Sequence, residues 1–209
     1  MNKVHFSVMT GKLADFKAIN TNTSTNSFCI KMNSAKKKTI CSVCYSHSML
    51  NTYRKNMAPA LQRNSDLLSS RPLEEEEIPK VLEAFIRIHA HGELINQQHL
   101  ANYVVIARSN PHCIFALWTK RKDIILRYFK EHEKPTNLIL IYSNPNVGTI
   151  LDTSPEYFDR TFNNVPEEQD IERQNCTGQQ CKNCMLCYTP NNGVSVIVEK
   201  VKSYGRKVK

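Results

Sequence analysis

The sequence predicts an α/β fold built on a parallel β-sheet, and three observations indicate it. Residues 85–142 of the 209-residue chain alternate short apolar runs with amphipathic stretches, in the order strand, helix, strand, helix, strand. Residues 113–118 are mostly apolar without interruption, as in a strand covered on both faces. Single helices between successive strands are typical of right-handed crossovers in a parallel sheet. We expect one domain over residues 1–209.

The first third of the chain predicts one strand, a loop and a broken helix. Residues 3–9 predict the strand, and residues 20–27 are too polar to pack, so they predict a loop. Residues 45–68 contain good helix formers, with Pro59 bending or restarting the helix. Four glutamates at 74–77 predict the acidic first turn of an amphipathic helix.

The rest of the chain predicts the sheet and its covering helices. The elements, in order, are a strand at 85–90, a helix at 96–108, a strand at 113–118, a helix at 123–130, a strand at 138–142 with a loop at 143–146, and a last strand at 194–198. Residues 152–175 are polar and acidic, so we expect irregular structure there, or a short helix around 155–162.

A cysteine-rich loop at residues 176–187 carries the strongest functional signal. Cys181, Cys184 and Cys187 have the C-x2-C-x2-C spacing of bacterial ferredoxins, and Cys176, Cys181 and Cys184 have the plant-type spacing C-x4-C-x2-C. Disulfides across such short gaps would strain the backbone. The N-terminus has no signal-peptide core, and in a reducing compartment grouped cysteines favour metal binding. We predict a metal-ligand loop, for iron–sulfur rather than zinc.

A second set, Cys29, Cys41 and Cys44, lies near the N-terminus. Alone, its C-x2-C pair fits a zinc half-site or, less well, a redox pair. Because both sets can meet at the sheet ends, we predict that the seven cysteines bind an iron–sulfur cluster, most simply of the 4Fe-4S type. One cluster, two clusters and a larger core all remain open. Cys113 opens an apolar strand, so we assign it to the core.

Polar residues at the strand ends form a second candidate site. In a continuing strand His89, His91 and Glu93 alternate onto one face, and parallel sheets gather their sites at the carboxyl ends of the strands. We take these three residues and Lys120 as candidate catalytic residues. A structural histidine is the alternative for the first two, and a solvated charge is the alternative for Lys120.

The net charge of +9 is concentrated in residues 36–38 and in the basic tail 200–209. Such runs are usually solvated arms, although nucleic acid remains a candidate partner. Apolar runs stay below 18 residues, so no membrane association is expected.

Across most of its length the chain resembles the gene product 88 family of phages. The resemblance rests on Met9-Thr10-Gly11-Lys12-Leu13, Cys29, Cys41-x2-Cys44-Tyr45, Tyr53-Arg54, Arg63-Asn64, His91-Gly92-Glu93, Trp118-Thr119-Lys120 and the cysteine-rich loop. Residues 115–121 are also similar to radical S-adenosylmethionine proteins of the spore photoproduct lyase kind.

The second resemblance implies a radical-enzyme-like partial (β/α) barrel, with a cluster at the carboxyl ends of its strands. It implies S-adenosylmethionine as a cofactor, with Gly92 and Glu93 in the place of a Gly-Gly-Glu stretch that contacts the methionine end. The N-terminal spacing is C-x11-C-x2-C, where radical enzymes usually have C-x3-C-x2-C, so we expect weak cleavage of the cofactor or none.

The sequence therefore predicts a phage-type iron–sulfur protein in the host cytoplasm, acting as a redox or radical-type enzyme. Its partner is expected to be a small-molecule substrate or a redox protein. Two alternatives remain: a zinc-stabilised nucleic-acid-binding protein and a noncatalytic electron carrier.

Overall fold

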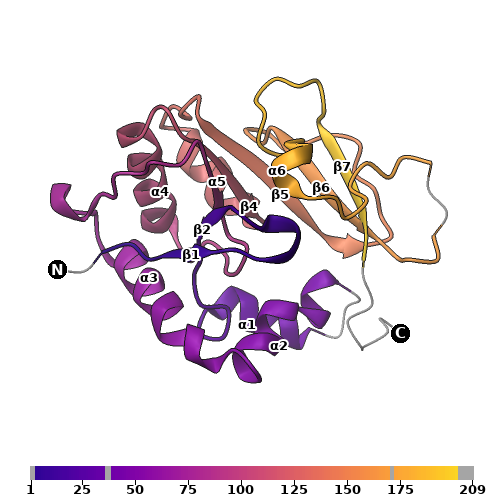
Figure 1. Cartoon of the computed structure of the whole chain (residues 1–209), viewed down its shortest axis with the longest axis horizontal. Coiled ribbons are helices and arrows are strands. Elements are labelled where there is room, and N and C mark those ends of the chain that lie inside the picture. Colours follow the sequence, from indigo (N-terminus) through magenta and orange to yellow (C-terminus); the bar gives the residue numbers. More distant parts are fainter. Residues whose placement is uncertain (1–2, 36–38, 170–171, 202–209) are drawn as a thin grey trace.

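A computed structural model describes residues 3–35, 39–169 and 172–201 (Figure 1). The lysine run 36–38 and residues 202–209 of the basic tail lie outside these ranges. The described residues form one sheet whose strands are β1 (Phe6–Val8), β2 (Lys17–Ile19), β3 (Phe85–Ile88), β4 (Ile114–Thr119), β5 (Leu138–Val147), β6 (Arg160–Val165) and β7 (Val196–Lys200).

Helices and single turns connect the strands. The helices are α1 (Ser27–Ser34), α2 (Tyr45–Asn51), α3 (Ala58–Ser70), α4 (Gln97–Ser109), α5 (Lys122–Phe129) and α6 (Cys181–Cys184). Short 3-10 turns are η1 (Gly11–Leu13), η2 (Ile40–Val43), η3 (Lys55–Met57) and η4 (Glu75–Glu77). None of the helices in the described ranges is long and apolar enough to cross a bilayer.

The predicted α/β class with a mostly parallel sheet is confirmed. Strand order in the sheet follows chain order from β1 to β7, and only the β1–β2 pair is antiparallel. Because parallel crossovers share one hand, this order places the crossover helices on one face of the sheet. β1 and β7 are its edges, so the sheet is open and does not close into a barrel.

Each face of the sheet has its own apolar core. The larger core packs alternate strand residues such as Phe115 and Leu117 against α3, α4 and α5. The smaller core lies on the opposite face, where Ala116 and Trp118 meet Tyr188 from the segment after α6. Figure 1 shows α4 and α5 on one side of the sheet and α6 on the other. We call the face under α6 the inner face.

Two strands were not predicted. β2 has only three residues, too few for a visible period. β6 falls in the segment that we expected to be irregular, because its sequence contains Asn163 and Asn164. Asn163 is buried with its amide paired: its Oδ1 accepts from Asn144 Nδ2 at 3.0 Å, and its Nδ2 donates to the Leu151 carbonyl at 3.2 Å. Hydrogen bonds to neighbouring segments thus allow a polar sequence to form a strand in the interior of the sheet, between β5 and β7.

The predicted helix after the four glutamates is wrong. Only the single turn η4 forms, because Pro79 cannot continue a helix, and Leu82 from the expected apolar face is 91% exposed. The loop expected at 143–146 is also wrong, since β5 continues through an irregularity to Val147. The break near Pro59 is confirmed: α2 ends at Asn51, and α3 begins with this proline in its first turn.

Candidate functional site

The loop after β2 is polar, as its sequence predicts, yet it is buried. Asn20, Thr21, Asn22, Thr23 and Asn26 all lie inside the protein. Asn20 Oδ1 accepts from the His91 backbone at 2.9 Å, and the Asn20 carbonyl accepts from Asn64 at 2.9 Å. Because Asn20, Asn22 and Asn26 are hydrogen-bonded to the structure around them, this loop has a fixed path into the segment that carries the N-terminal cysteines.

The N-terminal cysteines share one neighbourhood at the carboxyl ends of the central strands. Cys29 is on α1, Cys41 is in η2 and Cys44 precedes α2. Asn33 of α1 donates to the Cys41 carbonyl at 2.8 Å. The same segment contacts the far end of β5, where Thr39 pairs with Asn146. The three thiols lie close enough to act on one another electrostatically, and both Glu93 and Lys120 act on Cys29 and Cys41. We call Cys29, Cys41 and Cys44 the N-terminal thiol group.

Glu93 joins the ends of two strands beneath this group. Its carboxylate accepts from the backbone of Leu94 and of Lys120, each at 2.8 Å, and from the Thr119 hydroxyl. Burial raises the pKa of this carboxyl, against the effect of Lys120 and of these hydrogen bonds. Since both oxygens are occupied, Glu93 holds the site together, and its side chain offers little to a ligand.

Lys120 places a cation among the thiols. Burial lowers the pKa of its ammonium group, but Cys41, Glu93, Cys44 and Cys29 together raise it above the usual value. The half-buried Lys120 therefore stays positively charged, and it offsets negative charge that develops on the sulfur atoms.

His91 and Gly92 border the same region. His91 Nδ1 lies 3.0 Å from Ser46 Oγ, and its ring makes an edge contact with Tyr45, which follows Cys44. Burial, with Arg54 and Arg87 nearby, lowers the pKa of His91 to about 4, so the ring is neutral at pH 7.

Gly92 has a φ of +107°, and a Cβ there would lie 2.0 Å from Thr21 Oγ1. The turn therefore needs glycine, since its backbone packs directly on the loop after β2.

His89 differs from the expectation of alternating side chains. β3 ends at Ile88, and His89 has a φ of +64°, so the strand does not continue through Glu93. The Nε2 atom of His89 lies 3.1 Å from the Tyr103 hydroxyl, and its Nδ1 atom lies 3.3 Å from the Trp118 carbonyl. The ring is paired at both nitrogens beside His99, in the arrangement of a structural histidine.

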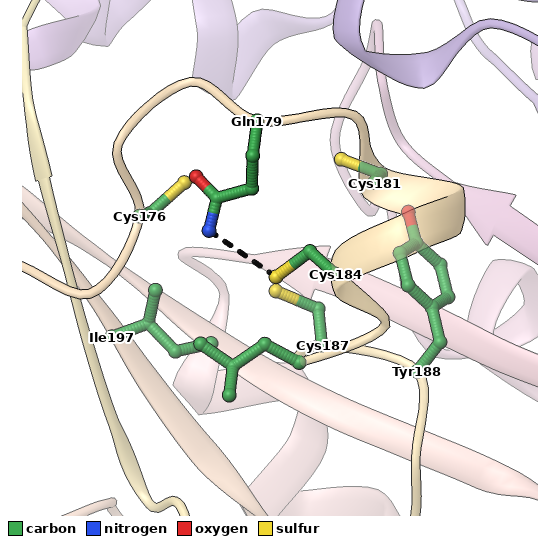
Figure 2. A pocket seen from close by; sticks show the side chains of 8 residues that line it. Cys176, Gln179, Cys181, Cys184, Cys187, Tyr188 and Ile197 are labelled. Atoms are coloured by element: carbon green, nitrogen blue, oxygen red, sulfur yellow. Dashed lines mark hydrogen bonds between the residues drawn. The ribbon is translucent and has the colours of Figure 1, made fainter.

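The C-terminal cysteines form a second group on the inner face. Figure 2 shows Cys176, Cys181, Cys184 and Cys187 lining one pocket, together with Gln179, Leu186, Tyr188 and Ile197. Gln179 Nε2 lies among the sulfur atoms and donates to Cys184 Sγ at 3.3 Å. We call these four cysteines the C-terminal thiol group.

All eight cysteines are free thiols. Cys113 is fully buried between β4 and the helices, and burial raises its pKa to about 12. Among residues 3–35, 39–169 and 172–201, no three His, Cys, Asp or Glu side chains stand as preformed ligands of a single metal ion.

Comparison with known proteins identified a family model that matches part of the chain. The matched part includes the N-terminal thiol group and excludes the C-terminal one. The model of the family described as "Gene product 88" matches residues 6–165. Neither curated proteins nor solved structures gave a match. The matched region contains Cys29, Cys41, Cys44, Glu93 and Lys120, and it ends before the cysteine-rich loop.

Proposed function

The chain belongs to the gene product 88 family, and we propose that it is an iron–sulfur protein whose N-terminal thiol group binds a four-iron cluster with one open iron. The observation that carries the proposal is the convergence of Cys29, Cys41 and Cys44 on Lys120 and Glu93. Thiolates are the usual ligands of iron–sulfur clusters. Three ligands on a four-iron cluster leave the fourth iron accessible to a small molecule.

The charged side chains around the N-terminal thiol group favour an iron–sulfur cluster as its ligand. A thiolate-ligated cluster is anionic, and its ligands must lose their protons when it binds. Burial raises the pKa of Cys29 and Cys41, so these thiols stay protonated without a metal, whereas Lys120 supplies the compensating positive charge. Glu93 fixes the Lys120 backbone, which positions that charge.

We further propose that the open iron binds S-adenosylmethionine. β2 is the first strand of the parallel series, and the cysteine segment follows it; β3 is the second, and His91-Gly92-Glu93 follows that. This is the order that the resemblance to radical enzymes implies. The unbroken strand order from β2 to β7 also suits a partial barrel, although the sheet is open. The longer gap between Cys29 and Cys41 contains most of α1.

Within this proposal the chain's own residues position the ligands. Asn26 caps α1, the helix that carries Cys29. Gly92 packs on Thr21 in the loop that leads into α1. Lys120 balances the cluster's charge, and His91 presents a neutral ring at the edge of the site. A reduced cluster held by Cys29, Cys41 and Cys44 would supply one electron to the sulfonium, so that a carbon–sulfur bond would break and release methionine; the 5′-deoxyadenosyl radical would become 5′-deoxyadenosine by taking a hydrogen atom from a substrate or from the buffer.

The test is anaerobic reconstitution with iron and sulfide, followed by electron paramagnetic resonance of the dithionite-reduced protein with and without S-adenosylmethionine. We expect the cofactor to change the signal of one cluster and methionine and 5′-deoxyadenosine to form slowly. The triple variant Cys29→Ser/Cys41→Ser/Cys44→Ser should lose the changed signal and the products, whereas Cys113→Ala should keep both.

Other outcomes decide against parts of the proposal. A colourless protein that retains zinc instead of iron would support the zinc-stabilised nucleic-acid-binding alternative. Reversible reduction with a signal that ignores S-adenosylmethionine would leave a noncatalytic electron carrier.

A further inference from the structure

We propose that the C-terminal thiol group, Cys176, Cys181, Cys184 and Cys187, is a second iron–sulfur site, separate from the N-terminal one and fully ligated by protein. The inference does not depend on the function proposed above. It rests on the fold of the cysteine-rich loop, on how that loop is anchored, and on the charges around it.

The backbone of the loop turns the four cysteines toward one pocket. Gly178, with a φ of +86°, lies at a bend between Cys176 and Cys181. Met185, with a φ of +51°, ends α6 in the left-handed conformation before Cys187. The turn of α6 is closed by a hydrogen bond of 2.8 Å from the Met185 amide to the Cys181 carbonyl. Side chains from a twelve-residue segment thus line a single pocket (Figure 2).

Regular structure holds the loop at both ends. The Cys176 amide donates to the Val198 carbonyl of β7 at 3.1 Å, and Arg160 of β6 donates to the Cys187 carbonyl at 3.2 Å. Next to Cys187, the buried Tyr188 packs on Phe16, with ring centroids 4.6 Å apart. Ligands supported by a sheet hold a defined geometry better than ligands on a free loop.

Three cations from different elements surround the pocket. Lys12 Nζ of η1 lies 3.9 Å from Cys176 Sγ. Arg87 of β3 acts electrostatically on Cys181 and Cys187, and Arg160 acts on Cys187. Lys12 is ion-paired with Glu199, whose carboxylate lies 3.7 Å from Cys176 Sγ, so the pocket faces these three cations together with that carboxylate. The excess of positive charge suits a thiolate-ligated cluster, which is anionic.

The spacing favours a cluster over a single zinc ion. Structural zinc sites usually pair two short C-x2-4-C units across a longer spacer, whereas here four cysteines follow one another at gaps of four, two and two. In a cluster each thiolate binds a different iron, so the sulfur atoms stay farther apart than around one zinc ion. Four thiolates occupy all four irons, which leaves this site without an open position.

The two sites also occupy different places in the fold. The N-terminal thiol group lies at the carboxyl ends of β3 and β4, and the C-terminal group lies on the inner face beside β7. The charged neighbours of Cys29 and of Cys41 are different from those of Cys181 and Cys187. The second site lies beyond the family match of residues 6–165.

The experiment compares three reconstituted proteins: wild type, Cys184→Ser/Cys187→Ser, and Cys29→Ser/Cys41→Ser/Cys44→Ser. We expect about eight irons and eight sulfides per chain in the wild type, and about four in each variant, because each variant loses one cluster. Cys113→Ala, which removes a core thiol, should keep the wild-type content. Circular dichroism establishes that each variant is folded.

Electron paramagnetic resonance of the reduced wild type supplies a measurement that needs no variant. We expect two overlapping signals, and addition of S-adenosylmethionine should leave the one assigned to the closed site unchanged. If the triple variant keeps about four irons while the wild type shows no response to the cofactor, the second site stands and the open-site proposal fails.

The inference is overturned if the wild type saturates at one cluster that the Cys184→Ser/Cys187→Ser variant retains. It is equally overturned if the C-terminal group takes up one zinc ion and excludes iron under the same conditions.

Discussion

Asn26 Nδ2 donates a hydrogen bond of 3.0 Å to the carbonyl oxygen of Glu93, and the same side chain caps the helix that carries Cys29. Its Oδ1 accepts from the backbone of Phe28 and of Cys29. One amide therefore connects the turn after β3 to the first cysteine of the N-terminal thiol group. These hydrogen bonds fix the start of α1 beside Glu93, although the two are far apart in the sequence.

Two substitutions of Asn26 should separate how much each of its roles stabilises the protein: capping α1, and donating a hydrogen bond to the Glu93 carbonyl. Asn26→Ala loses both functions, and we expect it to lower the free energy of unfolding by about 1–2 kcal/mol. Asn26→Ser keeps an oxygen that caps α1 but loses the donor to Glu93, so its stability should lie between those of the wild type and Asn26→Ala. Urea unfolding measures this order. The difference between Asn26→Ser and Asn26→Ala measures the cap, and the difference between the wild type and Asn26→Ser measures the hydrogen bond to Glu93. An Asn26→Ser variant as stable as the wild type would show that this hydrogen bond contributes nothing.

Gly92→Ala should destabilise the protein by clearly more than about 1 kcal/mol, because alanine at this φ is strained and its Cβ would overlap Thr21. Gly193→Ala is the matched control: its φ is +75°, with nothing within 4 Å of the added Cβ. The difference between the two variants in thermal unfolding isolates the close packing on Thr21. Iron bound by the N-terminal thiol group should fall only in Gly92→Ala.

Stability should decrease below neutral pH because of buried histidines. His99 is fully buried, and burial lowers its pKa to about 3. The unfolded chain binds a proton near pH 6.5 while the folded chain does not, so acid favours unfolding from that pH down to about 3. Between pH 7.5 and pH 5 this one residue should cost about 2 kcal/mol.

The variant His99→Asn tests that assignment, since the amide oxygen can still accept from the Ile95 backbone as Nδ1 does at 3.2 Å. Its free energy of unfolding should change less between the two pH values than that of the wild type. His132→Asn, at an exposed position, should follow the wild type. A wild-type pH dependence in His99→Asn would contradict the prediction.

Lys12→Met should lower the reduction potential of the proposed C-terminal cluster. Removing the cation near Cys176 leaves Glu199 beside the site, and both effects disfavour adding an electron. We expect a decrease on the order of tens of millivolts, because the charge lies close to the thiols and is only partly screened. A potentiometric titration measures it. Lys130→Met, an exposed change at the end of α5, should leave the potential unchanged.

The sequence by itself determined the α/β class and the order of the central elements, and it supplied the cysteines that we propose as metal ligands. The run 113–118 and the capped helix α4 could be predicted because their signals are local: an unbroken apolar stretch, an N-cap asparagine and a terminating proline. The four cysteines of the loop are likewise recognisable from spacing alone, since the gaps limit which ligands they can share.

Only the tertiary structure decided which of these residues lie together. It separated the seven candidate ligands into two groups, placed Lys120 among the N-terminal thiols, and paired His89 with Tyr103 of the larger core. It also formed β6 from a polar sequence whose amides find partners in neighbouring segments. The physical reason is the same in each case: these contacts join residues distant in the chain, and their energies depend on burial and partner geometry that no local pattern contains.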